Sequence, residues 1–248
     1  MTSQVLHTLD EEGMSHFSSL HDIRFGKMGH ALPVGSVRHL SRDELRVRLE
    51  RMSRSSENED CSRPIALSTG FAELDAVLPG GGWPVGAITE LMPEAQGIGE
   101  LSLLLPALAR LSQAGRYLVW IAPPCLPYPL ALERQGLALD RLLLVQAQDA
   151  QAVLWAAEQA LRCPAIGAVL AWPASLDYRR VRRLQLAAET GGSCGLLYRP
   201  PAAAQQPSPA ALRLRLKALD AGLRIEIQKA RGGRTHALVV HPAAAVCA

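Results

Sequence analysis

A short loop after an apolar strand pattern at 87–91 stands where a phosphate-binding loop could stand. Such loops have the spacing G-x-x-x-x-G-K-[ST]. The glycines permit tight turns, the lysine contacts the β- and γ-phosphates, and the hydroxyl ligates Mg²⁺. The four motif positions here hold Met92, Gly97, Ile98 and Gly99, so both the lysine and the hydroxyl residue are missing. We therefore expect this loop to bind no nucleotide.

Histidine and cysteine offer no second kind of chemistry. Five histidines lie in residues 1–63 at spacings of 9, 5, 9 and 9, which fit no metal-ligand pattern on one helix face. Residues 67–200 contain no histidine, so they lack the commonest general base. The five cysteines are at least 30 residues apart and form no C-x-x-C pair, which excludes a zinc knuckle and a redox dithiol.

Positive charge is concentrated at the C-terminal end of the chain. Residues 201–248 carry seven basic and two acidic side chains, whereas the rest of the chain is close to neutral. Leu212 to Lys217 alternates leucine with basic residues, which predicts a strand with leucines inward and the basic residues on one exposed face. We expect a partner or DNA contact at six cations: Arg213, Arg215, Lys217, Lys229, Arg231 and Arg234. An ordinary edge strand protected by charge is the alternative.

Short apolar runs alternate with helical patterns over the middle of the chain. Strands are expected at 87–91, 117–121, 142–145, 168–171 and 195–198, and amphipathic helices at 99–113, 129–135, 150–162 and 176–190. Near-continuous apolar strands between helices are typical of a parallel sheet covered on both faces. After a linker at 200–209 the pattern has a period of two, which predicts an antiparallel extension.

The sequence divides into three parts. Residues 1–63 are expected to be a partly disordered accessory segment, although Ser41 to Glu44 has the pattern of a capping box that opens a helix. Residues 64–200 form the predicted α/β core, and 201–248 the basic extension and tail. Hydrophobic residues make up 48% of the chain, enough for a sizeable core. No apolar run reaches the roughly 18 residues of a membrane span and no signal peptide is evident, so a cytoplasmic protein is expected.

Several motifs in a fixed order resemble the RecA/RadA recombinase family. Ser68-Thr-Gly-Phe-Ala-Glu-Leu-Asp75 precedes Gly80-Gly-Gly-Trp-Pro-Val-Gly86, a strand and the loop, and Lys229-Ala-Arg-Gly-Gly-Arg234 resembles the segment that ends such cores. The resemblance covers about residues 67–241. It implies a RecA-like core with a mostly parallel β-sheet flanked by helices.

The residues that carry ATPase chemistry in that family are absent. The resemblance places a catalytic carboxylate at the end of the second core strand and a magnesium-linked carboxylate after the fourth, where this chain has Pro124 and Trp172. The sequence also has no lysine between Lys27 and Lys217 that could replace the missing one. Without a cation, a hydroxyl or carboxylates, nothing neutralises the charge that develops on a transferred phosphoryl group. We expect a RecA-like fold without enzymatic activity and without a cofactor.

The loop, the stretch from Gly80 to Leu91 and the alternating strand at 212–216 also look like the ImuA family of translesion-synthesis accessory proteins. Residues 103–172 are similar to SulA, the inhibitor of the division protein FtsZ. The length, the recombinase-like opening and the basic tail favour ImuA. That resemblance implies a non-catalytic role in SOS-induced mutagenesis at the nucleoid. Its implied partners are a Y-family-like polymerase homologue of the ImuB type, an error-prone replicative-type DNA polymerase and RecA.

Two alternatives remain open at this point. The first is a SulA-like division inhibitor that binds FtsZ. The second is a working RecA-type ATPase that uses unusual residues.

Overall fold

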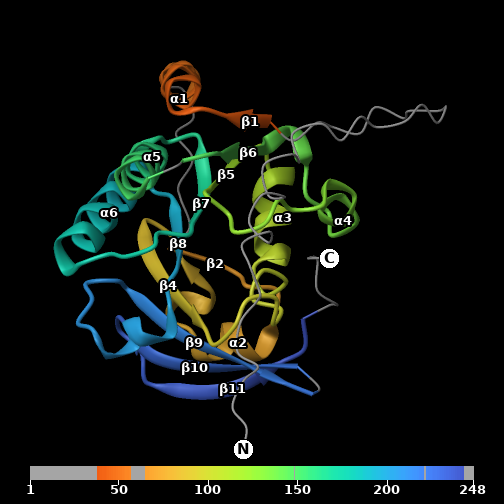
Figure 1. Ribbon diagram of the computed structural model, residues 1–248. Helices are drawn as coiled ribbons and strands as arrows, with labels where there is room; N and C mark the ends of the chain where they lie inside the picture. Colours follow the sequence, from red (N-terminus) through yellow and green to blue (C-terminus); the bar gives the residue numbers. More distant parts are fainter. Residues whose placement is uncertain (1–37, 57–64, 148, 221, 243–248) are drawn as a thin grey trace, which may run out of the picture. The chain divides into compact units, whose positions relative to one another are not determined.

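Nine strands form one sheet in the computed structural model, which describes residues 38–56, 65–147, 149–220 and 222–242 (Figure 1). The order across the sheet is β1-β6-β5-β7-β8-β4-β9-β10-β11. In chain order these strands are β1 (Arg38–Leu40), β4 (Ala87–Pro93), β5 (Tyr117–Ile121), β6 (Leu142–Val145), β7 (Ile166–Ala171), β8 (Cys194–Tyr198), β9 (Leu212–Leu219), β10 (Gly222–Ala230) and β11 (His236–Val240).

Within this sheet, all neighbouring strands from β1 across to β9 pair in parallel. The strands β9, β10 and β11 pair antiparallel. A separate two-stranded sheet joins β2 (Ala66–Leu67) to β3 (Trp83–Pro84). The fold is therefore α/β with a mostly parallel sheet and an antiparallel C-terminal group, as the sequence predicts.

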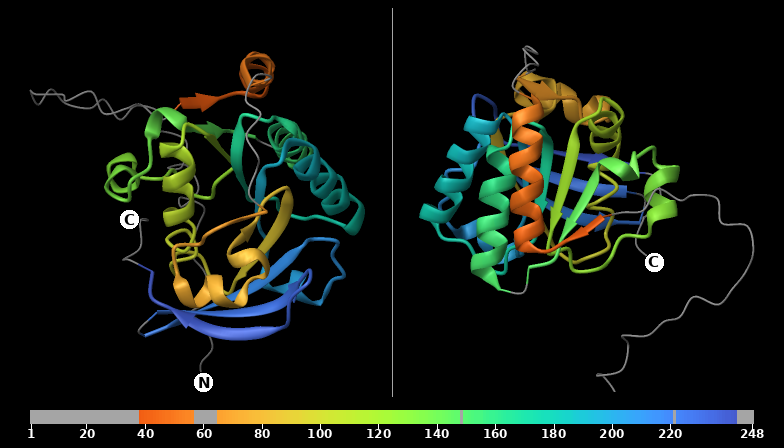
Figure 2. Two further views of the ribbon diagram at one scale, coloured as in Figure 1. Left: turned by 180° about the vertical axis from the view of Figure 1, so that it is seen from behind. Right: turned by 90° about the horizontal axis from the view of Figure 1, so that it is seen from above.

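Helices cover both faces of the sheet. One face carries α2 (Ala72–Val77), α3 (Leu105–Gln113) and α4 (Pro129–Arg134). The other carries α1 (Arg42–Ser56), α5 (Ala150–Arg162) and α6 (Tyr178–Gly191), which lie side by side in Figure 2. Short 3-10 helices occur at Pro79–Gly81 (η1), Leu139–Arg141 (η2) and Pro201–Gln205 (η3).

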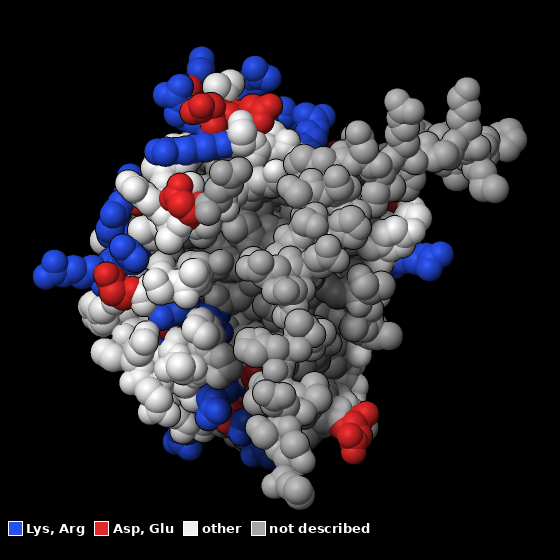
Figure 3. All heavy atoms as spheres, in the orientation of Figure 1, with Lys and Arg blue, Asp and Glu red and all other residues white. Residues whose placement is uncertain are grey.

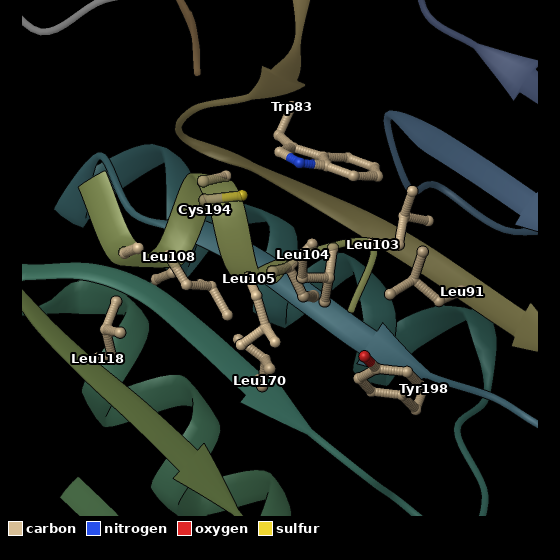
Figure 4. Close-up of a cluster of buried hydrophobic side chains, with 14 of the residues drawn as sticks. Trp83, Leu91, Leu103, Leu104, Leu105, Leu108, Leu118, Leu170, Cys194 and Tyr198 are labelled. Carbon is tan, nitrogen blue, oxygen red and sulfur yellow. The ribbon is translucent and has the colours of Figure 1, made fainter. Parts of the chain in front are cut away.

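The core under α3 is made of leucines that the sequence places in an apolar helix. Leu104, Leu105 and Leu108 are at most 1% exposed, while Leu101 and Leu111 are partly buried. Figure 4 shows leucines of this segment beside side chains of β4, β7 and β8. The helix begins at Leu105 instead of the predicted residue 99, so Pro106 lies in its first turn. Proline is tolerated there because its missing N–H has no partner within the helix, and no kink results.

Part of the predicted accessory segment belongs to the sheet. Residues Arg38–Leu40 pair in parallel with β6, and α1 packs on α5. The capping box is confirmed, since the Ser41 main-chain N–H donates to Glu44 Oε2 at 2.8 Å. The rest of that segment, residues 1–37 and 57–63, lies outside the described residues.

Candidate functional site

The loop after β4 keeps the course of a tight glycine turn without phosphate-binding groups. Gly97 and Gly99 have φ of 77° and 97°, a conformation that favours glycine. The Gly97 main-chain N–H, a group that phosphate loops direct at their ligand, donates to Glu100 Oε1 at 2.9 Å. Ile98 is half-buried and packs on the hydrophobic core. Met92, at the first position of the motif, precedes the loop and is buried within β4.

The ends of β5 and β7 hold rigid apolar residues where the resemblance places carboxylates. After β5 the chain passes through Ala122, whose φ of 50° is unusual for a residue with a side chain, into two prolines. After β7, Trp172 stacks on Tyr198 of β8 with ring centroids 4.6 Å apart and an angle of 3° between the planes. Trp120 lies 6.2 Å from Trp172 in a tilted arrangement. No acidic side chain occupies either position.

These segments border one open cavity of about 520 Å³ at the carboxyl edge of the parallel strands. It is lined by parts of 93–96 and Glu100 after β4, by Ala122 and Pro124 after β5, by 172–174 after β7, and by 198–201 at the end of β8. Ligands of open α/β sheets bind at this edge. The structure thus brings together Pro124, Trp172 and the degenerate loop, which the sequence identified separately.

A buried ion triad that was not predicted shares Arg199 with the lining of this cavity. Glu90, in the middle of β4, is fully buried and accepts hydrogen bonds from Arg199 Nη1 and Arg213 Nε, each at 2.6 Å. Arg199 also donates to the main-chain oxygen of Leu176 and to Gln206. The only signal in the sequence was a charged residue inside an apolar strand, which requires a buried partner. Glu90 balances the charge of only one of the two guanidiniums, so the triad keeps a net positive charge that its hydrogen bonds hold inside the fold.

The predicted basic face of β9 is corrected by this triad. The inward leucines are confirmed, since Leu212, Leu214 and Leu216 are buried. Arg213 is buried as well, only 7% exposed, because η3 covers that face and its Ala203 carbonyl accepts from Arg213 Nη2 at 2.7 Å. Arg213 is therefore not available to a partner.

Two further predicted cations on β9, Arg215 and Lys217, lie close to one carboxylate of β10. Lys217 donates to Glu226 Oε1 at 2.9 Å and Arg215 lies 4.0 Å from Glu226 Oε2, so one carboxylate serves both. The hydrogen bond from Lys217 lowers the pKa of Glu226.

The turn after β10 carries predicted cations that are more exposed to solvent than those on β9. Lys229 donates to the Ser208 carbonyl at 2.8 Å, and burial together with the charges of Arg213 and Arg231 lowers its pKa. Arg231 and Arg234 are exposed. Figure 3 shows basic side chains around α1 and along α5 and α6 as well as over the C-terminal strands. Among the six predicted cations, Arg231 and Arg234 offer the best-exposed positive charge.

Neither a metal site nor a membrane-spanning helix is present in the described part of the chain. No group of three or more His, Cys, Asp or Glu side chains there is arranged to hold a metal ion. Each described helix falls short of the length and apolarity that crossing a membrane requires.

Comparison with known proteins places the site in context. The family model for the cell division inhibitor SulA matches residues 86–195, from the start of β4 into β8. SulA of Edwardsiella piscicida is 36% identical over 101 residues, which are 40% of this chain and 60% of that protein. SulA of Yersinia enterocolitica is 30% identical over 115 residues, covering 46% of this chain and 68% of that protein. The chain belongs to the SulA-related family.

This SulA-related chain also matches the protein ImuA of Caulobacter vibrioides, with 30% identity over 141 residues. That match covers 54% of the chain and 58% of the ImuA protein. The chain thus spans between 58% and 68% of the length of these three relatives. The cavity-forming segments from β4 to β7 lie within the part that matches the SulA model.

Proposed function

We propose that this SulA-related protein is a non-catalytic accessory factor of SOS-induced mutagenic translesion DNA synthesis, acting through protein–protein contacts. Its proposed partners are a Y-family-like polymerase homologue of the ImuB type, an error-prone replicative-type polymerase and RecA. The observation that carries the proposal is the cavity at the carboxyl edge, where the ATPase fold would hold its nucleotide and where Pro124 and Trp172 stand instead.

The charge at this edge supports a non-catalytic role. The loop carries Glu94 and Glu100 and no basic residue, and the Arg199 guanidinium already bonds to Glu90, Leu176 and Gln206. A triphosphate brought here would face two carboxylates, and most of its charge would stay uncompensated because Arg199, the one cation among the described lining residues, already pairs with Glu90. Phosphoryl transfer depends on positive groups around the transferred phosphate, so this arrangement disfavours both binding and chemistry.

The extent of the ImuA match supports the assignment to translesion synthesis. It covers 54% of the chain, whereas the SulA matches given above cover 40% and 46%. Outside the matched SulA model, the structure has further ordered elements, namely α2, the β2–β3 sheet and the strands β9 to β11. The SulA model alone therefore does not account for the described structure.

A SulA-like role in blocking division through FtsZ is the second candidate. It is favoured by the family model, whose match spans the degenerate loop and the strands β5 and β7. Both candidates are adaptors that act by binding proteins, and they differ in the process that they affect.

A genetic experiment separates the two candidates. Deleting the gene should lower damage-induced mutation frequency, and overproducing the protein should leave cell length unchanged. The core variant Leu104→Asp, which should not fold, provides the matched negative control for complementation. Filamentation on overproduction, together with unchanged mutation frequency in the deletion strain, would favour the division inhibitor and contradict the proposal.

A further inference from the structure

The cavity at the carboxyl edge is unusual in its hydrogen-bonding character. Five of the residues that line it are prolines: Pro93, Pro124, Pro173, Pro200 and Pro201. Proline has a carbonyl acceptor but no main-chain N–H donor. Anion sites in proteins use successive main-chain N–H groups, so this lining is poorly suited to phosphate or carboxylate ligands. The lining is mostly apolar and short of main-chain donors, so it fits a ligand that supplies its own donors.

Two carboxylates give the cavity a negative character. Glu94 is exposed and its Oε1 accepts from the Ala218 N–H at 2.7 Å, which fixes the carboxylate at the rim. Glu100 accepts from Gly97 through Oε1, while its Oε2 is buried and has no hydrogen-bond donor among the described residues. A buried carboxylate oxygen without a donor is costly, and a cationic donor would satisfy it. The one cation in the lining, Arg199, is already held by Glu90.

The aromatic pair completes a surface for a flat cation. Trp172 borders the cavity and is held in place by its stack on Tyr198, whose hydroxyl donates to the main-chain oxygen of Glu100 at 3.3 Å. Guanidinium groups stack on aromatic rings and carry five N–H donors and no acceptor. Arginine therefore matches three properties of the cavity: a shortage of donors, two carboxylates against one cation, and an aromatic wall.

We infer that the cavity binds an arginine side chain presented by an extended segment of a partner protein. The volume of about 520 Å³ exceeds what one guanidinium fills and leaves room for residues flanking the arginine. Prolines and aromatic rings lose little conformational freedom on binding, so they suit a preformed peptide site. This inference deepens the proposed function, on which it rests, because it assigns the vacated nucleotide edge to partner recognition.

The test uses the full-length protein and two peptides that differ in one group. The probe is the blocked peptide Ac-Ala-Ala-Arg-Ala-Ala-NH₂, and its matched control carries citrulline, which is neutral and nearly isosteric. Binding is followed by NMR on the Trp172 indole N–H signal, assigned with the variant Trp172→Phe. The arginine peptide should shift this signal saturably and bind at least about 5-fold more tightly than the citrulline peptide.

Variants of the carboxylates locate the site. Glu100→Gln should reduce arginine-peptide affinity to that of the citrulline peptide, and Glu94→Gln should weaken it less. Glu133→Gln, an exposed glutamate on α4 outside the cavity, should leave it unchanged. Equal affinity for the two peptides, an unshifted Trp172 signal, or an equal loss in Glu133→Gln would overturn the inference.

Adding Mg²⁺–ATP in the same NMR experiment distinguishes a failure of the arginine-site inference from a failure of the proposed function. A peptide that fails to bind while ATP also has no effect contradicts only the arginine site. Saturable ATP shifts at Trp172 would show that this edge still holds nucleotide and would contradict the observation on which the proposed function rests.

Discussion

Trp172 and Tyr198 form a nearly parallel stack, 4.6 Å between ring centroids, at the edge of the sheet where a nucleotide-binding relative would hold its magnesium-linked carboxylate. Two neighbouring parallel strands, β7 and β8, supply the two rings. The stack gives this edge an apolar wall in place of a metal-binding group. We propose that this rigid aromatic surface replaces a nucleotide site.

Restoring the loop alone should not restore ATPase activity. The double variant Ile98→Lys, Gly99→Thr regains the cation and the hydroxyl, but Pro124 and Trp172 still provide no carboxylate. Because Gly99 has φ of 97°, threonine there is strained, so the single variant Ile98→Lys is measured alongside, with circular dichroism as the folding control. Phosphate release should stay at the buffer background in both. Hydrolysis above background in either variant would show that the missing carboxylates are dispensable.

The buried triad should be essential for stability. Glu90→Gln leaves Arg199 and Arg213 without their countercharge in a buried place, which is expected to cost about 3–5 kcal/mol of the free energy of unfolding. Glu226→Gln removes a half-exposed carboxylate that pairs with cations of β9 and should cost at most about 1 kcal/mol. Urea denaturation measures both. Similar losses in the two variants would mean that burial does not govern the cost.

The leucines under α3 should behave as core residues and not as a docking face. Leu104 is fully buried, so Leu104→Ala is expected to cost about 2–5 kcal/mol and Leu104→Asp to give insoluble or unfolded protein. Leu186 on α6 is 45% exposed, and Leu186→Ala should change stability by no more than about 0.5 kcal/mol. A folded, soluble Leu104→Asp protein that had only lost a partner would identify this face as an interface.

Lowering the pH should remove a stabilising contribution from the turn at residues 68–75. Burial alone would raise the pKa of Asp75, but hydrogen bonds from Ser68 Oγ and the Thr69 N–H, at 2.6 and 2.7 Å, outweigh it and lower that pKa. A lowered folded-state pKa stabilises the protein above the unfolded-state value of about 3.9 and loses this effect as pH falls through the folded-state value.

The variant Asp75→Asn tests this linkage. Its deficit in unfolding free energy relative to the parent protein should be constant near neutral pH and shrink in acid. Asp140→Asn, an exposed aspartate, serves as the control and should show little deficit at any pH. A deficit for Asp75→Asn that grows as pH falls would contradict the assignment.

The exposed turn after β10 is expected to be the docking part of the basic tail. Arg231→Glu with Arg234→Glu should abolish capture of the Y-family-like polymerase partner while the thermal melt stays nearly unchanged, because both side chains are exposed. The matched control Arg179→Glu with Arg182→Glu makes the same charge change on exposed positions of α6. Undiminished capture by the first pair would exclude this turn.

Salt dependence distinguishes a protein partner from DNA at the same turn. If the partner is a protein, rising salt should mainly slow its association with the turn. If the partner is duplex DNA, log affinity should fall with log salt at a slope of about −0.9 per phosphate contacted. We expect the first behaviour. A steep slope with DNA alone would assign the turn to nucleic acid.

The strands and helices were predictable where one pattern dominates. The expected bounds of β5, β6 and α5 agree with the structure, because continuous apolar runs and a 3.6-residue period leave no competing arrangement. The edge strand β1 was missed, since three residues with two basic side chains carry no periodic signal. The start of α3 was placed too early because its leucine pattern continues into the preceding turns.

The sequence could predict which phosphoryl-transfer residues are absent from the site, but it could not predict which side chains contact one another there. Local sequence predicted that Ile98, Pro124 and Trp172 do not support phosphoryl transfer, and this stays a prediction. Alternation showed which face of β9 holds Arg213 but not that η3, in a segment expected to be a linker, covers that face. The stack of Trp172 on Tyr198 likewise depends on the pairing of two strands distant in sequence. Such long-range contacts are fixed by tertiary packing, which no single window of sequence contains.

Isothermal titration of the full-length protein with ATP and Mg²⁺ tests the central claim most directly. With Ile98 in place of the cation and two carboxylates at the loop, the titration should give no heat beyond dilution up to millimolar nucleotide. Saturable binding in the micromolar range, weakened by a change at Trp172 or Glu100, would show that the carboxyl edge still holds nucleotide and would contradict the account.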